Sequence, residues 1–280
     1  WPWALAIAAA YAAFKLILYF ITEIVAIRMA VWRAFYAVFD RLLAWSGHAN
    51  FDTMNWGFSN GAPKPVEHPR EVHLALYRKV IGDAAKEGAL LEVGSGRGGG
   101  AFHLAELGYE SVTGLDLSQK HVELCRRRAK QSDAVRMRFV QGSADAMPVD
   151  DETFDVVLNV ESSHCYPDFD RFLDECYRVL RPGGTLRWCD FRTCEEWDAL
   201  RSHFATHACW EIAEEEDMTA GVVAASERLT PWYREKLRVV RWLVPLYETL
   251  HNFGCLVGSR NYQKLEEREW IYGRLALIKR

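Results

Sequence analysis

From residue 71 onward, the chain alternates between two kinds of hydrophobic pattern. Short apolar runs rich in β-branched residues predict buried strands, and longer stretches with apolar positions every three or four residues predict helices. The predicted strands cover 89–94, 111–117, 136–142, 153–160 and 185–191. The predicted helices cover 73–87, 99–108, 118–131 and 168–180, with Ser118 and Asp168 as caps of the last two. This alternation predicts an α/β fold with a parallel, doubly wound, Rossmann-like sheet.

Residues 1–47 have a different pattern, because the stretch 1–45 is apolar around most of its helical surface and contains no Gly. Its charge-free run ends at Phe14, which is shorter than a clean membrane span. A narrow charged stripe on such a helix is typical of an anchor that lies in or partly enters a membrane. The alternative is a helix that packs on the domain or forms a homo-oligomer with a second subunit. We therefore expect a membrane-associated protein.

The remaining segments flank the predicted core. The polar stretch 48–69 contains Gly and Pro and predicts a loop, and its Trp56 and Phe58 suit a flap over a bound cofactor. The acidic stretch 211–218 predicts a helix, and the basic, aromatic stretch 229–254 suits a cap or a membrane-facing lid. Packing of this region against the sheet is the alternative. The expected regions are a membrane anchor (1–47), the flap and first helix (48–88), the core (89–192), a helical cap (193–257) and a final strand region (258–280).

Composition narrows the classes of partner. The chain has 280 residues, of which half are apolar, so it can bury one sizeable core. Its net charge of -4 provides no basic field, and we do not expect a nucleic-acid partner. Seven unclustered cysteines indicate free thiols in a reducing compartment, which places the catalytic domain on the cytoplasmic side of a membrane. His203 and His207 lie one helical turn apart without a convincing set of partners, so no metal site is predicted.

The turn after the first predicted strand reads EVGSGRGGG, residues 92–100. Gly94, Ser95 and Gly96 allow a tight turn in which the backbone closely approaches a ligand. A glycine-rich turn of this kind can also bind the pyrophosphate of a dinucleotide. Glu92 argues against that ligand, because a carboxylate at this position is misplaced for a pyrophosphate and suits a cation such as an α-amino group.

Two further acids follow neighbouring strands. Asp116 lies at the end of the second predicted strand, where a carboxylate can accept hydrogen bonds from both ribose hydroxyls. Asp145 follows the third strand and suits the exocyclic amine of an adenine. An amino group, a ribose and an adenine together describe S-adenosyl-L-methionine. The remaining predicted contacts with this cofactor are Leu117, Ala144, Asn159 and Val160.

The segments EVGSGRGGG, GLDLS, GSADAMP, FDVVLNVESSHCYPD and RVLRPGG resemble class I S-adenosylmethionine-dependent methyltransferases in order and spacing. Three segments are more specifically similar to mycobacterial phthiotriol/phenolphthiotriol dimycocerosate methyltransferases and fatty-acid O-methyltransferases: SVTGLDLSQKHVELCRRR, FVQGSADAMPVDDETFDVVLNVESSHCYPDFDRFLDE and CDFR. The resemblance covers about residues 88–192, with a weaker similarity over 258–279. It implies a seven-stranded sheet, a methyltransferase activity and a lipid-like acceptor. The members of these families lack the long N-terminal helix, and 193–257 matches them poorly.

The stretch after the fourth predicted strand supplies the candidate catalytic groups. His164 is the predicted general base, because its ordinary pKa suits proton transfer near neutral pH. Glu161 is predicted to orient His164 or to act in its place. Trp56, Tyr166 and Tyr272 are predicted to line the acceptor pocket.

The sequence therefore predicts O-methylation of a hydroxyl or carboxyl group on a lipid-like acceptor at a membrane. One alternative is C-methylation of a sterol-like or terpene-like alkene, in which the acids near Glu161 would stabilise a carbocation. Another alternative is a membrane-tethered protein that binds the cofactor without turnover.

Overall fold

The computed structural model describes residues 52–61, 66, 68–131, 136–206, 209–238, 241 and 244–280. Asp52–Arg280 forms one compact unit. The predicted apolar helix at residues 1–45 lies outside the described residues. Within the described ranges, no helix combines the length and the apolar character that crossing a bilayer requires.

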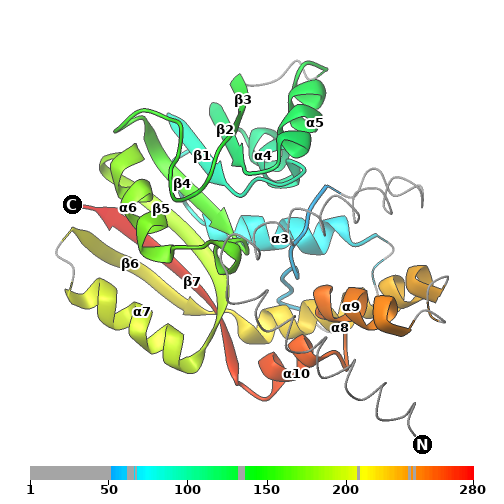
Figure 1. The fold of residues 1–280 in the computed structure, drawn as a ribbon. Helices are drawn as coiled ribbons and strands as arrows, with labels where there is room; N and C mark the ends of the chain where they lie inside the picture. The colour runs from blue at the N-terminus through cyan, green and yellow to red at the C-terminus, as the bar shows by residue number, and fades with distance from the viewer. Residues whose placement is uncertain are drawn as a thin grey trace, which may run out of the picture. The chain divides into compact units, whose positions relative to one another are not determined.

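The described unit is built on a sheet with the strand order β3-β2-β1-β4-β5-β7-β6 (Figure 1). The strands are β1 (Ala89–Val93), β2 (Ser111–Asp116), β3 (Arg136–Gln141), β4 (Phe154–Val160), β5 (Leu180–Thr193), β6 (Trp210–Asp217) and β7 (Trp270–Lys279). The first five strands are parallel, which confirms the doubly wound α/β prediction. Strand β7 runs antiparallel to β5 and β6, so the sheet is mixed. The strand order reverses between β1 and β4, and open sheets of this kind bind ligands at such a point.

The helices are α3 (Arg70–Ile81), α4 (Gly99–Glu106), α5 (Gln119–Ala129), α6 (Phe169–Val179), α7 (Cys194–Thr206), α8 (Thr219–Leu237), α9 (Val244–Phe253) and α10 (Arg260–Glu266). Ser118 and Asp168 cap α5 and α6 with their side chains, as predicted. Helix α3 ends earlier than its hydrophobic pattern predicted. Gly82 follows its last residue with a positive φ of 56°, which Gly adopts readily and which stops the helix.

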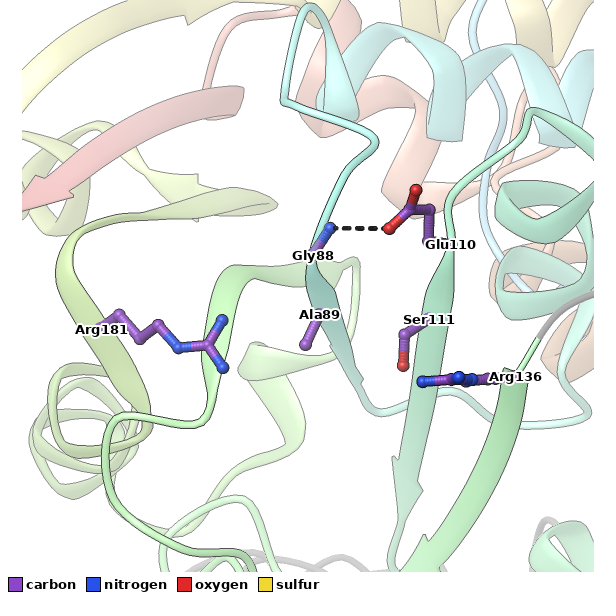
Figure 2. Close-up of a pocket in the computed structure, with 6 residues that line it drawn as sticks. All are labelled: Gly88, Ala89, Glu110, Ser111, Arg136 and Arg181. Atoms are coloured by element: carbon purple, nitrogen blue, oxygen red, sulfur yellow. Dashed lines mark hydrogen bonds between the residues drawn. The ribbon is translucent and has the colours of Figure 1, made fainter.

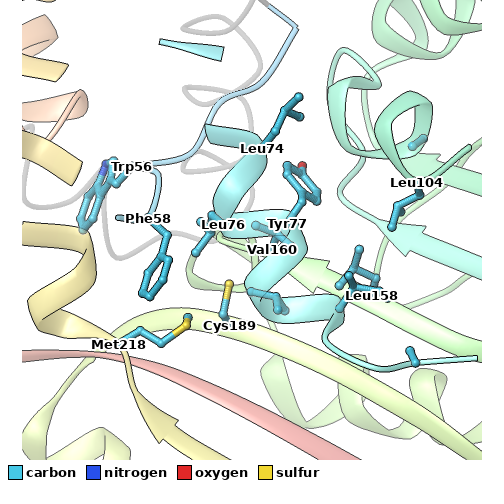
Figure 3. Close-up of a cluster of buried hydrophobic side chains, with 14 of the residues drawn as sticks. Trp56, Phe58, Leu74, Leu76, Tyr77, Leu104, Leu158, Val160, Cys189 and Met218 are labelled. Atoms are coloured by element: carbon cyan, nitrogen blue, oxygen red, sulfur yellow. The ribbon is translucent and has the colours of Figure 1, made fainter. Parts of the chain in front are cut away.

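Two hydrophobic clusters cover the two faces of the sheet. Leu90, Val112 and Leu158 belong to one cluster with side chains from α3, α4 and α5, and Figure 3 shows part of this cluster. Leu91, Val157 and Leu186 belong to the other cluster, with side chains from α6 and α7. Successive strand residues alternate between the two faces, so the apolar runs read in the sequence are strands buried on both sides.

The acidic stretch 211–218, predicted as a helix, is instead the edge strand β6 with Met218 after it. Its acids face basic groups of the sheet and of α3. Glu214 contacts Arg187 at 2.8 Å and Arg274 at 2.7 Å, and Glu216 contacts Lys79 at 2.7 Å. These tertiary ion pairs, together with pairing to β7, override the local helical preference of the glutamates. Residues 210–217 therefore complete the sheet.

Residues 52–59 run from the first turn of α4 to α8. The amide of Gly99 donates to the carbonyl of Asp52 at 3.0 Å, and the amide of Ser59 donates to the carbonyl of Gly221 at 3.0 Å. Between these ends, the indole N–H of Trp56 donates to the carbonyl of Phe253 at 2.9 Å. This part of the predicted flap therefore connects the glycine loop to the helices after β6.

We predict that Glu214→Gln lowers the free energy of unfolding by about 2 kcal/mol, because it weakens the pairing of two buried guanidinium groups. The side chains of Arg187 and Arg274 are only 9% and 5% exposed. Urea denaturation of the full chain measures the change. Glu211→Gln on the same strand is the matched control, since Glu211 and its partner Arg280 are both largely exposed. Equal unfolding free energies for the two variants would contradict the structural role given to Glu214.

Candidate active site

The glycine loop between β1 and α4 lies against the ends of β2 and β4. The amides of Gly94 and Ser95 both donate to the carbonyl of Leu115, at 2.8 and 3.0 Å. Gly94 has a φ of 76°, and a Cβ there would lie 2.5 Å from the Ser162 hydroxyl. The loop therefore requires a glycine at this position for both its conformation and its close packing.

The two glycines that begin α4 are explained by close contacts as well. A Cβ on Gly99 would lie 2.5 Å from the carbonyl oxygen of Asp52. A Cβ on Gly100 would lie 2.1 Å from the ring of Tyr77 and 2.3 Å from a carboxylate oxygen of Glu92. These glycines let the flap and α3 approach the loop.

Asp116 ends β2 beside this loop. Its carboxylate accepts hydrogen bonds from the amides of Gly96 and Ser118, both at 2.8 Å. The His121 ring nitrogen lies 3.3 Å from the same carboxylate. These contacts fix the carboxylate at the carboxyl end of the sheet, followed by Leu117.

The third predicted acid lies after the neighbouring strand. The amide of Gly142 donates to the Asp116 carbonyl at 3.1 Å, which places the end of β3 beside the end of β2. Ala144 is buried, and the half-buried Asp145 accepts a hydrogen bond from the Ser143 hydroxyl. Ala144 and Asp145 therefore lie at the same edge of the sheet as Asp116, as predicted from the sequence.

Asn159 and Val160 end β4, next to β1. The side-chain amide of Asn159 donates to the Val93 carbonyl at 3.0 Å and to the Tyr166 hydroxyl at 2.8 Å. Tyr166 was predicted to line the acceptor pocket with Trp56 and Tyr272. The structure places its hydroxyl against the glycine loop, close to Gly94.

Glu92 is 1% exposed, and neither of its carboxylate oxygens makes a hydrogen bond within the described part of the chain. Burial raises the pKa of Glu92 to about 8, and the nearby Tyr77 hydroxyl and Ala101 amide offset this only in part. A buried carboxylate without donors is destabilising unless a ligand supplies them. The arrangement therefore has the charge and the geometry of a site for a cationic group.

His164 lies in the turn after β4 and contacts a buried carboxylate. Its Nδ1 lies 2.9 Å from Asp190 Oδ1, and its backbone amide donates to Asp190 Oδ2 at 2.8 Å. Burial alone would lower the pKa of His164, but the carboxylate of Asp190 outweighs this and raises the pKa well above 6.5. With Nδ1–H held by Asp190, Nε2 is the ring nitrogen available to a ligand.

Glu161 does not make this contact with His164. Its Oε2 instead accepts hydrogen bonds from the Trp56 amide at 2.9 Å and from the Tyr272 hydroxyl at 2.6 Å. Burial raises the pKa of Glu161 to about 8, although these two donors and His164 oppose the shift. Trp56 and Tyr272, both predicted to line the acceptor pocket, therefore meet at Glu161.

Stacked aromatic rings lie between these groups. Phe191 stacks on Trp56 with ring centroids 4.5 Å apart and on Trp270 at 4.8 Å. The His164 ring contacts the same Phe191 at 4.5 Å. His164 and Glu161 therefore border one cluster of stacked aromatic rings.

Sequence reasoning missed Asp190 and Phe191. Both lie in the segment CDFR, at the end of the fifth predicted strand, which entered the prediction only through its family resemblance. The position of Asp190 near the carboxyl end of its strand could have indicated its role, because the carboxyl ends of adjacent parallel strands meet at one edge of the sheet. An acid at the end of β5 should therefore have been paired with the histidine that follows β4.

A cavity of about 550 Å³ lies at the opposite, amino-terminal ends of the strands (Figure 2). Its lining includes Gly88 and Ser111, together with Arg136 and Arg181. None of the residues predicted for the cofactor or the acceptor belongs to this lining.

A methyltransferase-domain family model matches residues 91–187. The chain is also 36% identical over 215 residues to the probable phthiotriol/phenolphthiotriol dimycocerosates methyltransferase 2 of Mycobacterium ulcerans, covering 74% of this chain and 81% of that relative. The chain belongs to the class I S-adenosylmethionine-dependent methyltransferases.

Two further relatives of this methyltransferase match shorter stretches. The phthiotriol/phenolphthiotriol dimycocerosates methyltransferase of Mycobacterium tuberculosis is 42% identical over 179 residues, which are 60% of this chain and 64% of the relative. The fatty-acid O-methyltransferase of Mycolicibacterium smegmatis is 42% identical over 155 residues, which are 52% and 56%.

Solved structures share the fold at low identity. The [4+2]-cyclase SpnF has a TM-score of 0.67 at 20% identity, covering 86% of this chain and 94% of that chain. The geranyl diphosphate C-methyltransferase of Streptomyces coelicolor has a TM-score of 0.54 at 18% identity, covering 81% and 89%. Because these proteins differ in their named reactions, the likeness shows the fold, and the acceptor chemistry must be argued from the site.

The methyl donor of this family is S-adenosylmethionine, and the residues at the glycine loop fit it. Four buried oxygen atoms without a hydrogen-bond partner in the described ranges lie on β1, the loop and β4: Glu92 Oε1, Glu92 Oε2, Ser95 Oγ and Asn159 Oδ1. A polar ligand at the carboxyl ends of these strands would satisfy such atoms.

We predict that binding of S-adenosylmethionine releases a proton near neutral pH, and that Glu92→Gln removes this release. In the free enzyme the pKa of Glu92 is about 8, so most molecules carry its proton at neutral pH. A bound ammonium group stabilises the carboxylate and lowers the pKa, so the proton leaves on binding. Calorimetry in buffers of different ionisation enthalpy measures the number of protons released.

The same variant should bind the cofactor about tenfold more weakly or worse, because one partner of a buried charge pair is lost. Glu87→Gln is the control, since Glu87 is exposed and precedes the same strand. Proton release that persists unchanged in Glu92→Gln would exclude Glu92 as its source.

Proposed function

We propose that this methyltransferase transfers a methyl group to an oxygen atom, hydroxyl or carboxyl, of an apolar, lipid-like acceptor. The observation that carries the proposal is the His164–Asp190 pair beside the stacked rings of Trp56 and Phe191. A histidine held by a carboxylate suits removal of a hydroxyl proton, and the rings suit a hydrocarbon chain. The names of the phthiotriol and fatty-acid relatives agree with an acceptor of this class.

The residues proposed to bind the cofactor lie at or just after the carboxyl ends of the parallel strands. Glu92 would pair with the ammonium group, and Asp116 would accept hydrogen bonds from the ribose hydroxyls. Asp145 and Ala144 would contact the adenine. The other proposed contacts are Gly94, Ser95, Gly96, Leu117, Asn159 and Val160. When bound, the cofactor supplies a methyl group attached to a sulfonium sulfur.

The protein's part in the reaction is to hold the acceptor oxygen and to take its proton. Nδ1–H of His164 donates to Asp190, so Nε2 can accept the hydroxyl proton as the oxygen bonds to the methyl carbon. Bound S-adenosylmethionine would supply the methyl carbon, and the electron pair of its carbon–sulfur bond would remain on sulfur. Asp190 then stabilises the imidazolium that forms. A carboxylate acceptor would need no base.

We predict that His164→Ala lowers kcat on a hydroxyl acceptor by about a hundredfold or more, because the general base is lost. Affinity for the cofactor should stay nearly unchanged, since His164 lies on the acceptor side. Steady-state kinetics and calorimetry give the two values. Wild-type turnover in this variant would rule out the base assignment.

Asp190→Asn gives a second, independent readout of the same pair. The Asp190 carboxylate raises the pKa of His164, so its replacement lowers that pKa. Because the neutral imidazole is the active form, the rise in rate with pH should shift to lower pH, with a reduced plateau. A thermal melt checks folding. An unshifted profile would show that another group titrates.

C-methylation of an alkene is the second candidate. Its support is the aromatic cluster of Trp56, Phe191 and Trp270 beside Glu161, because aromatic rings can stabilise a cationic intermediate. That reaction does not require a base at a hydroxyl, so His164→Ala would affect it less.

We further propose that the enzyme is attached to a membrane with its catalytic unit on the cytoplasmic side. The support is the apolar composition of residues 1–45, together with the basic and aromatic residues at the end of α8. Trp232, for example, is half-buried and lies under the ammonium of Lys236.

We predict that the full chain floats with phosphatidylcholine/phosphatidylglycerol vesicles in a density gradient. The variant Leu5→Glu/Ile7→Glu should float much less, because it places charges in the charge-free run. Recovery of the unaltered chain in the bottom fraction would contradict membrane attachment.

A further inference from the structure

We propose that Glu161 selects acceptors that carry a second hydroxyl group near the oxygen to be methylated, and disfavours acceptors whose polar group is a carboxylate. This rests on the proposed function and narrows its acceptor class from oxygen-containing lipids to hydroxylated ones.

Glu161 directly follows the last residue of β4, and its backbone is in the left-handed region with a φ of 47°. Its amide donates to the Cys189 carbonyl at 2.9 Å, which fixes this conformation between β4 and β5. Side-chain-bearing residues rarely adopt such a φ, and strain of this kind concentrates at functional sites. The position of the Glu161 side chain is therefore maintained against a backbone cost.

The two carboxylate oxygens of Glu161 are in different situations. Oε2 accepts both hydrogen bonds, from the Trp56 amide and the Tyr272 hydroxyl. Both side-chain hydrogen bonds to this carboxylate from described residues end on Oε2, and the side chain is only half-buried. Tyr272 is fully buried and Trp56 is 6% exposed, so these two donors hold Glu161 rigidly and leave Oε1 for a ligand.

Glu161 and His164 border the same aromatic surface. Trp56, which binds Glu161, stacks on Phe191, and Phe191 also contacts the His164 ring. The charges of Glu161 and His164 interact through this region. In the proposed complex, one hydroxyl of the acceptor meets Nε2 of His164 and the neighbouring hydroxyl meets Oε1 of Glu161.

Oε1 requires a hydrogen-bond donor. A hydroxyl group supplies one, whereas a carboxylate supplies none and adds a negative charge beside Glu161 and Asp190. A bound hydroxyl also favours the ionised form of Glu161, while a bound carboxylate opposes it. The pKa of about 8 allows both effects to be observed in solution.

The test compares two acceptors of equal chain length, a long-chain vicinal diol and the corresponding fatty acid, in the same detergent at a pH above 8. We expect the unaltered enzyme to use the diol with a kcat/KM at least about tenfold higher, as for one hydrogen bond to a charged group. Glu161→Gln should reduce this preference about tenfold, mainly through KM for the diol, because its amide can also donate to a carboxylate.

Glu152→Gln is the matched control. Glu152 is also a glutamate with a positive φ, of 48°, but it lies at the turn before β4 and pairs with Lys279. It should keep the preference of the unaltered enzyme, and cofactor affinity should be the same in all three proteins.

The outcomes separate the two proposals. Equal use of both acceptors by the unaltered enzyme, or a preference that Glu161→Gln leaves unchanged, would overturn the role of Glu161 while O-methylation stands. Methylation of neither acceptor would overturn the proposed function together with this inference. The comparison of the two acceptors needs only the unaltered enzyme. It can therefore overturn the proposed selectivity even if the Glu161→Gln variant does not fold.

Discussion

Asp190 is a carboxylate with no exposure to water, and the turn after β4 is arranged around it. Its oxygens accept hydrogen bonds from the amides of His164 and Phe191, from the Ser163 hydroxyl and from the His164 ring. Burial opposes its charge, but His164 and Arg192 hold the pKa of Asp190 well below its usual range. Removing a partner from such a buried charge is strongly destabilising, so this carboxylate fixes both the turn and the histidine. The proposal that His164 is the general base depends on this fixed contact with Asp190.

Two other carboxylates lie at the same edge of the sheet in contrasting surroundings. Glu92 has no hydrogen bond of good geometry among the described residues, although the Tyr77 hydroxyl and the Ala101 amide lie close to it, and Glu161 has two donors on one oxygen. Burial raises the pKa of both to about 8, whereas that of Asp190 falls. Burial dominates at Glu92 and Glu161, whereas at Asp190 the neighbouring charges of His164 and Arg192, together with the hydrogen bonds from His164 and Ser163, outweigh it. Glu92 and Glu161 are therefore suited to bind a ligand, and Asp190 is suited to position His164.

The sequence was sufficient to predict the parallel strands and the caps at Ser118 and Asp168, because these depend on local pattern. It also predicted Asp116, Asp145 and Asn159 as cofactor contacts, since such sheets bind ligands at the carboxyl ends of their strands. The strand β6 could not be predicted, because its glutamates are held by arginines distant in the sequence. The partner of His164 is different, because the position of Asp190 near the carboxyl end of the neighbouring strand β5 was a signal that the sequence did contain.

The central claim is that this enzyme methylates an oxygen atom of a hydroxylated lipid at His164. The most direct measurement uses S-adenosylmethionine with a trideuterated methyl group and a long-chain diol, followed by mass-spectrometric fragmentation of the product. The account predicts that the label is lost with an oxygen atom, as a methoxy fragment, and that His164→Ala makes little of this product. A label retained on the carbon chain, or a labelled methyl ester formed from a fatty acid in preference to the diol ether, would contradict it.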